Sequence, residues 1–238
     1  MTRTERPSRV GERARDVLSR LLRRDPHSPR GSCASSLEKT SELWGQEAGT
    51  WKVGRGVHWT ELAAVQERIN RKVSGDPHVD PYMYFIRHIQ NQGITLPVGR
   101  CLTLGCGAGE LERGLAPLGF SRRHDAFDVA AGAIATAKRL AESEGLSGIH
   151  YDVQDANELV LEAGVYDVVF GVMSVHHFTR LEHVFAEVRK ALKSGGHFLL
   201  NEFVGPTKFQ WTDRQLEIIN GLLAVLPPRY RATRDGGV

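Results

Sequence analysis

The stretch "LTLGCGAGE", residues 102–110, places three glycines at alternate positions directly after an apolar run. Glycine tolerates positive φ angles and lets the backbone approach another group closely. Such a turn between a strand and a helix can hold main-chain N–H groups against a ligand, and a nucleotide-like ligand is the natural occupant. A glycine loop alone is a weak signal, because a tight turn can need the same residues for packing.

After Pro97, short apolar strands alternate with amphipathic helices. Strands are predicted over 100–105, 125–129, 148–153, 166–172 and 196–204, with helices over 109–118, 130–144 and 180–193. This alternation implies right-handed crossovers and a parallel sheet covered on both faces. The expected fold class is therefore α/β, a Rossmann-like doubly wound sheet whose ligands lie beyond the carboxyl ends of the strands.

Composition restricts the class of protein further. A chain of 238 residues with 41% hydrophobic residues can bury one large domain. It has no apolar run near the roughly 18 residues of a membrane span, and its N-terminus is charged where a signal peptide is apolar. The three cysteines, Cys33, Cys101 and Cys106, have no metal-ligand spacing. We therefore expect a cytoplasmic protein without disulfides or a bound metal.

The net charge of +3 is unevenly distributed along the chain. Residues 1–30 carry nine arginines against four acidic residues, a net charge of +5, so that the rest of the chain carries −2. A nucleic-acid partner needs a basic face on the folded domain, and the basic residues gather instead in this tail. We therefore expect no nucleic-acid partner.

The patterns divide the chain into four segments. Residues 1–40 are predicted to be a flexible basic tail, and 41–97 a helical segment that can fold over the site as a lid. Residues 98–204 form the predicted ligand-binding core, followed by a helical segment over 205–238. Aromatic residues of the lid segment can line a substrate pocket or simply pack: Trp44, Trp51, His58, Trp59, Tyr82 and Tyr84.

Two aspartates follow strands of the core. Asp128 ends the second predicted strand, 19 positions after Gly109, where a carboxylate can accept hydrogen bonds from ribose hydroxyls. Asp155 follows the third strand, where it can accept from an adenine amino group or cap the turn that follows. Both positions favour a ligand that contains a nucleoside.

Five stretches together resemble the successive motifs of class I S-adenosylmethionine-dependent methyltransferases: "LTLGCGAGE", "FDVAAGAIATAK", "VQDAN", "YDVVFGVMSVHHF" and "VRKALKSGGHFLLNEF". The resemblance covers roughly residues 98–204. It implies that S-adenosylmethionine lies across the carboxyl ends of the first, second and fourth strands, with the glycine loop beside its methionine part. The cofactor-binding residues that it implies are Gly105, Cys106, Gly107, Gly109, Asp128, Val129, Asp155, Ala156, Gly171, Val172 and Met173.

One position departs from this resemblance. The family usually has an acidic residue two positions before the first glycine, where this sequence has Thr103. A hydroxyl can accept a hydrogen bond, but it cannot balance the charge of the cofactor's ammonium group. Glu110, directly after the loop, is a possible substitute, although glutamates are common at helix starts for other reasons.

Methyl transfer from a sulfonium is an in-line displacement, for which the protein must align the nucleophile and exclude water. If the acceptor is a hydroxyl, a base must take its proton, and His176 and His177 after the fourth strand are candidates. Because successive residues usually point apart, we expect at most one of them to reach the substrate. Glu202, at the end of the fifth strand, is the second candidate, with an ion pair as its alternative role.

The sequence therefore predicts a methyltransferase that acts on a small or medium-sized, hydroxylated acceptor such as a sugar or lipid precursor. Two alternatives stay open: a non-catalytic cofactor-binding scaffold, and an NAD-dependent oxidoreductase, whose usual GxGxxG loop ends where this chain has Glu110.

The family normally has two further strands that cover the fifth, and we find none after residue 204. We therefore expect a shortened or fragmentary chain. Either the chain by itself is unstable and prone to aggregation, or the exposed strand edge is covered by the helix around 213–226 or by another subunit, which makes a homo-oligomer possible.

Overall fold

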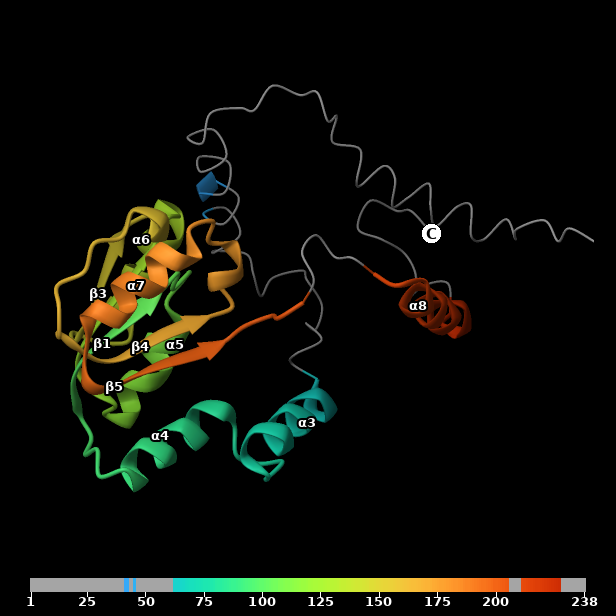
Figure 1. The fold of residues 1–238 in the computed structure, drawn as a ribbon, viewed down its shortest axis with the longest axis horizontal. Coiled ribbons are helices and arrows are strands. Elements are labelled where there is room, and N and C mark those ends of the chain that lie inside the picture. Colours follow the sequence, from blue (N-terminus) through green and yellow to red (C-terminus); the bar gives the residue numbers. More distant parts are fainter. Residues whose placement is uncertain (1–40, 43–44, 46–61, 206–210, 228–238) are drawn as a thin grey trace, which may run out of the picture.

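Five parallel strands form the centre of the structure (Figure 1). The computed structural model describes residues 41–42, 45, 62–205 and 211–227. The strands are β1 (Val98–Leu104), β2 (Ser121–Asp128), β3 (Ile149–Val153), β4 (Tyr166–Val172) and β5 (Leu192–Asn201). They lie in the order β3-β2-β1-β4-β5, and every pairing is parallel. The chain order reverses between β1 and β4, the place where open α/β sheets bind ligands.

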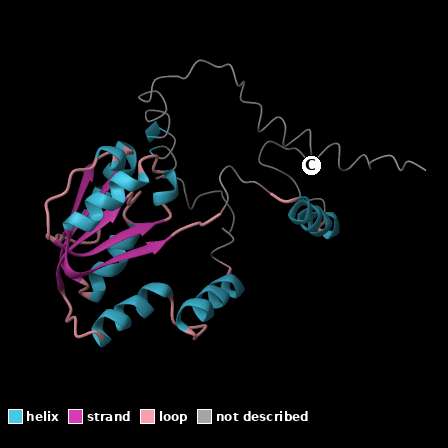
Figure 2. Ribbon diagram, viewed as in Figure 1, coloured by secondary structure: helices cyan, strands magenta, loops and turns pink. Residues whose placement is uncertain are grey.

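Helices cover both faces of this sheet, as Figure 2 shows. They are α4 (Pro81–Asn91), α5 (Glu110–Leu115), α6 (Ala131–Ser143) and α7 (Leu181–Ala191), whereas α3 (Ala63–Ser74) packs against α4. Successive strand residues face opposite sides, so Cys101 packs with α4 and α5 whereas its neighbour Leu102 packs with α7. The central strands are buried on both faces, and the predicted Rossmann-like, doubly wound fold is confirmed.

Three of the strands, β1, β2 and β5, depart most from their predicted bounds. The first strand begins at Val98, and the second begins at Ser121, four residues before the apolar pattern starts. The reason is pairing: the polar start of β2 lies in register with the start of β1, from Val98 opposite Ser121. The fifth strand runs from Leu192 through a register shift and ends at Asn201, earlier than predicted. Glu202 therefore lies just beyond the strand.

Part of the predicted lid segment is described. Helices α3 and α4 are present, and the predicted interruption between them is the turn that ends at Asp80, which caps α4. The Tyr82 hydroxyl accepts a hydrogen bond from Asn201 Nδ2 at 3.0 Å, which ties α4 to the end of β5. Tyr84 is exposed and stacks on His88. The predicted tail and four of the lid residues lie outside the described residues: Trp44, Trp51, His58 and Trp59.

One edge of the sheet is formed by β5, which pairs with β4 and with no further strand among the described residues. Helix α8 (Asp213–Val225) has no buried residue and lies apart from the sheet in Figure 1. The described helix over 213–225 therefore does not cover this edge. In the described part of the chain, no helix is long and apolar enough to cross a membrane.

Candidate functional site

The glycine loop, residues 105–109, follows β1 at the carboxyl edge of the sheet. Gly105 has a φ angle of 65°, and a Cβ at this position would lie 2.6 Å from the Ser174 Cβ. The Ser174 hydroxyl donates to the Leu104 carbonyl at 2.6 Å. The loop after β4 is therefore tied directly to the glycine loop, and only glycine fits the contact.

Gly107 and Asp128 form the open side of the loop. The φ angle of Gly107 is 53°, and a Cβ there would meet no atom within 4 Å. Its N–H donates to Asp128 Oδ2 at 2.9 Å, while the Ala130 N–H donates to Oδ1 at 2.8 Å. The carboxylate is partly exposed and keeps further lone pairs for a ligand. The carbonyl of Val129, the next residue, accepts from the Ser41 hydroxyl at 3.1 Å.

Cys106 and Gly109 fix the loop to the protein. The Cys106 N–H donates to the Phe127 carbonyl at 2.9 Å, and burial raises the pKa of its thiol well above the usual value. Gly109 precedes the first residue of α5, and the Tyr151 hydroxyl donates to its carbonyl at 3.4 Å. The Cys106 side chain is therefore a neutral packing group rather than a nucleophile.

Asp155 serves as a cap in this structure. Its Oδ1 accepts from the backbone N–H and from the side-chain amide of Asn157, each at 2.9 Å, at the start of the short 3₁₀ helix Ala156–Glu158. Ala156 is buried in the core. Both of these hydrogen bonds use Oδ1, so Oδ2 is the oxygen that can face a ligand.

Gly171, Val172 and Met173 lead out of β4. Gly171 is buried, and Val172 packs partly against the core. Met173 is half-exposed and has a φ angle of 51°, while its N–H donates to the Asn201 carbonyl at 2.8 Å. A non-glycine residue with positive φ is strained, and such strain gathers at functional sites.

Glu202 and His176 form a hydrogen-bonded pair beyond the ends of β4 and β5. The Glu202 Oε2 atom lies 2.7 Å from His176 Nδ1. Oε1 accepts from the N–H groups of Ser174 at 2.8 Å and Val175 at 2.7 Å. The carboxylate thus holds both the loop and the imidazole, which favours a proton on Nδ1 and leaves Nε2 as the free base position.

The second histidine lies against the first. The ring centroids of His176 and His177 are 4.1 Å apart, so the prediction that the two side chains point apart is wrong. Both belong to one tight 3₁₀ turn, Val175–His177. Burial lowers the pKa of His177, and so does the charge of His176, while the carboxylates of Glu202 and Asp128 oppose the change. The histidines therefore share an electrostatic environment with Asp128.

Sequence analysis missed Glu112. Its side chain is fully buried in α5, and neither carboxylate oxygen has a hydrogen-bond partner in the described part of the chain. Glu110, the predicted substitute for an acidic residue at Thr103, is instead exposed at the helix start. Helical spacing could have predicted its burial, because Glu112 lies three positions before the buried Leu115, on the face of α5 that meets the sheet.

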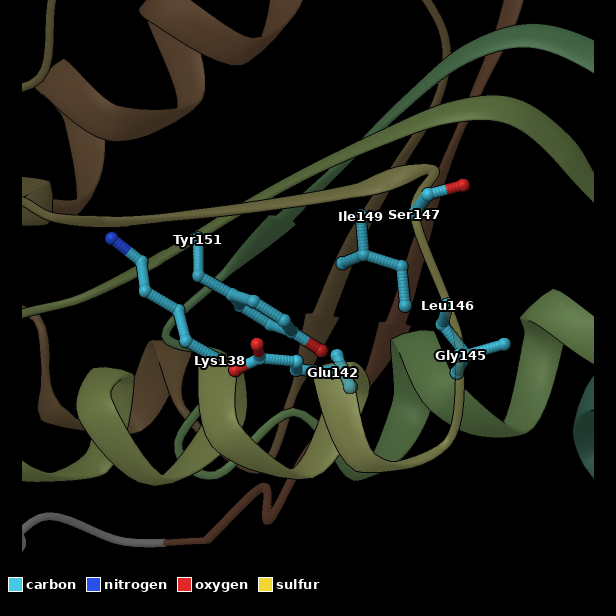
Figure 3. A pocket seen from close by; sticks show the side chains of 8 residues that line it. Lys138, Glu142, Gly145, Leu146, Ser147, Ile149 and Tyr151 are labelled. Atoms are coloured by element: carbon cyan, nitrogen blue, oxygen red, sulfur yellow. The ribbon is translucent and has the colours of Figure 1, made fainter.

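A surface hollow of about 390 Å³ lies elsewhere, where α6 turns into β3 (Figure 3). Its lining includes Lys138, Glu142, Ser147 and Ile149, near the amino end of β3. Ligands of parallel sheets bind at the opposite, carboxyl edge, so this hollow is not the candidate site. In the described residues no group of three or more His, Cys, Asp or Glu side chains could hold a metal ion.

A glycine loop at the switch point, an aspartate after β2 and a loop after β4 define a Rossmann-like nucleotide-binding protein of the α/β class. Comparison with known families identifies it further: residues 102–200 match the methyltransferase domain family. The chain carries a class I S-adenosylmethionine-dependent methyltransferase domain, and S-adenosylmethionine is the cofactor of that class.

Individual relatives match over part of their length. The chain is 29% identical over 129 residues to a sterol methyltransferase-like 2 protein of Botryococcus braunii. The aligned region covers 53% of this chain and 33% of the relative. The chain is 24% identical over 107 residues to the uncharacterized methyltransferase YcgJ of Bacillus subtilis, covering 45% of this chain and 42% of the relative. The chain thus spans less than half the length of these relatives.

Among solved structures, the chain is similar to phosphoethanolamine N-methyltransferase 2 of Haemonchus contortus in complex with S-adenosyl-L-methionine. The TM-score is 0.48 and the identity 19%, covering 68% of this chain and 38% of that one.

Proposed function

We propose that this protein transfers a methyl group from S-adenosylmethionine to a hydroxyl group of a small-molecule acceptor. The observation that carries the proposal is the His176–Glu202 pair, which lies beside the glycine loop at the edge where parallel sheets bind ligands. A carboxylate that orients a histidine is the usual arrangement for a general base acting on a hydroxyl.

The residues of the loop fit the cofactor. The open space at Gly107 leaves room for a ligand against the main chain, and Asp128 has lone pairs for ribose hydroxyls. Asp155 would face the adenine amino group through Oδ2. Met173 would flank the transferable methyl group, where its half-exposed side chain can contact the acceptor.

The protein's part in the reaction is alignment and proton removal. When bound, the cofactor supplies a methyl group on a sulfonium, a good leaving group that departs as a neutral thioether. His176 Nε2 accepts the acceptor's hydroxyl proton as the oxygen forms its new bond to the methyl carbon. Glu202 stabilises the resulting imidazolium through Nδ1–H.

The class of acceptor follows from one relative and from the presence of a base. The relative named sterol methyltransferase-like 2 is consistent with a small-molecule acceptor for the chain. A hydroxyl is the acceptor that explains why a base stands beside the site. A sugar or a lipid precursor satisfies both conditions.

Binding and transfer are tested separately. Calorimetric titration with S-adenosylmethionine, S-adenosylhomocysteine and NAD should show binding of the first two and not of NAD. Cofactor with a labelled methyl group is then supplied with fractionated extract to find the acceptor. Replacing His176 by Ala should lower turnover about 10²- to 10⁴-fold with unchanged cofactor affinity.

The outcomes separate the alternatives. Binding of NAD alone would identify an oxidoreductase, and cofactor binding without transfer to any fraction would favour a non-catalytic scaffold. Full activity of the His176→Ala, His177→Ala and double variants would exclude a histidine base.

A further inference from the structure

We propose that Glu112 is the counter-ion for the ammonium group of the bound cofactor, supplying from α5 the negative charge that Thr103 cannot supply from β1. The inference rests on the proposed function, because it concerns the same cofactor. It assigns to Glu112 a charge-balancing role rather than contact with the reacting atoms.

The buried carboxylate of Glu112 lacks hydrogen-bond partners among the described residues. The Glu112 side chain has 0% exposure, and neither of its oxygens makes a hydrogen bond within the described residues. The Thr103 hydroxyl lowers the pKa of Glu112 from β1, and Thr103 Oγ1 also lies 2.9 Å from His124 Nε2. A buried acid that lacks partners destabilises the folded state and calls for a functional explanation.

Glu112 also lies close to the strand that leads into the glycine loop. Thr103 is the last residue but one of β1, so Glu112 lies against the strand that leads directly into the glycine loop. Its charge acts on Asp128 and on Cys106, which belong to the ribose side and to the loop itself. The methionine part of the cofactor is expected beside this same loop.

Within the described part of the chain, no cation forms an ion pair with this carboxyl. Thr103 from β1 and Asp128 from β2 act on its pKa, and its own charge raises the pKa of Cys106 in the loop, of Tyr151 in β3 and of Tyr82 in α4. Arg113, on its own helix, lowers the pKa of Glu112, but its guanidinium pairs with Glu144 at 3.1 Å and with the Ala108 carbonyl.

These surroundings make the charge of Glu112 dependent on the ligand. Burial raises the pKa of Glu112 to about 7, so much of the empty protein holds a proton there at neutral pH. An ammonium group nearby favours the ionised carboxylate, because unlike charges attract strongly in a low-dielectric interior. Cofactor binding should therefore release a proton from Glu112.

The test is calorimetric titration of wild type and Glu112→Gln, with Glu110→Gln as the control of equal charge change. The probes are S-adenosylhomocysteine, which has the ammonium but not the sulfonium, and 5′-methylthioadenosine, which lacks the whole amino-acid part. Titrations in two buffers of different ionisation enthalpy at pH 7 give the number of protons released.

We expect wild type to release a fraction of one proton with S-adenosylhomocysteine and none with 5′-methylthioadenosine. Glu112→Gln should bind S-adenosylhomocysteine about 10- to 100-fold more weakly, because the ammonium group loses its counter-charge in a low-dielectric interior, and should release no proton. Its affinity for 5′-methylthioadenosine should be unchanged, and Glu110→Gln should behave as wild type.

Equal affinity and equal proton release in wild type and Glu112→Gln would overturn the inference while leaving the proposed function intact. The same holds if Glu110→Gln shows the loss instead. Should Glu112→Gln fail to fold, proton release by wild type decides: none at pH 7 excludes a counter-ion that ionises on binding. If wild type binds neither ligand, the proposed function itself fails.

Discussion

The Nδ1 atom of His176 lies 2.7 Å from Oε2 of Glu202, and the other oxygen of the same carboxylate accepts two backbone N–H groups from the loop that carries the histidine. One side chain thus fixes the position of the loop and the orientation of the imidazole. The two roles can be separated by substitution.

Replacing Glu202 by Gln should lower turnover about 10- to 10³-fold with little loss of stability, because the amide oxygen can still accept from Ser174 and Val175 while the negative charge that stabilises the imidazolium is lost. Glu202→Ala should also lower the free energy of unfolding by about 2–4 kcal/mol, since both buried N–H groups lose their acceptor. Steady-state kinetics and urea unfolding of the two variants check this. Equal turnover of Glu202→Gln and wild type would show that His176 needs no carboxylate.

Asp128 is expected to serve both the loop and the cofactor. Asp128→Ala should weaken cofactor binding by roughly 1.5–3 kcal/mol, through loss of charged hydrogen bonds to the ribose. It should also lower the melting temperature of the empty protein, because the N–H groups of Gly107 and Ala130 lose their acceptor. Asp128→Asn keeps one side-chain acceptor and should lose less of both. Unchanged cofactor affinity in Asp128→Ala would remove Asp128 from the ribose site.

Two glycines of the loop should respond differently to alanine. Gly105→Ala places a Cβ 2.6 Å from Ser174 and should destabilise the fold by about 2–4 kcal/mol. Gly107→Ala meets no atom within 4 Å, so only the positive φ angle opposes it, at about 1–2 kcal/mol. The Gly107→Ala protein should therefore fold but bind cofactor weakly, because the Cβ fills the open side of the loop. Thermal melts and titration calorimetry measure the two effects, and wild-type affinity in Gly107→Ala would mean that the cofactor lies elsewhere.

The stability of the empty protein should depend on pH through Glu112. Its pKa is about 7 in the folded protein against 4.5 in the unfolded chain, so the folded state binds more protons between these values. The contribution of Glu112 is fully present below about pH 4.5 and is lost as the pH rises through 7. The free energy of unfolding should fall by about 3 kcal/mol over this range relative to Glu112→Gln.

Urea titrations of both proteins from pH 4.5 to 8 measure this difference. Burial lowers the pKa of His124 to about 4, which gives a slope of opposite sign, but His124 is present in both proteins and cancels in the comparison. Parallel stability curves for the two proteins would contradict a raised pKa for Glu112.

Local patterns in the sequence predicted most of the fold. The alternation of apolar strands with amphipathic helices depends on near neighbours in the sequence, and β1, β3 and β4 lie within two residues of their predicted bounds, whereas β2 and β5 each begin four residues early. The start of β2 was missed because "SRRH" is polar and becomes a strand only through its pairing with β1. The glycine loop was located because its three glycines follow the strand directly.

By itself the sequence determined the α/β class and the family of the core, because these depend on periodicity and on motif order along the chain. Only the tertiary structure decided the partners of the side chains. His176 meets Glu202 from 26 residues away, and Ser174 meets Leu104 from 70 residues away. Glu112, rather than Glu110, is the acid beneath the loop. Such contacts depend on the register of the strands and on the rotation of each helix about its axis. The spacing of residues along the sequence predicts this rotation only approximately.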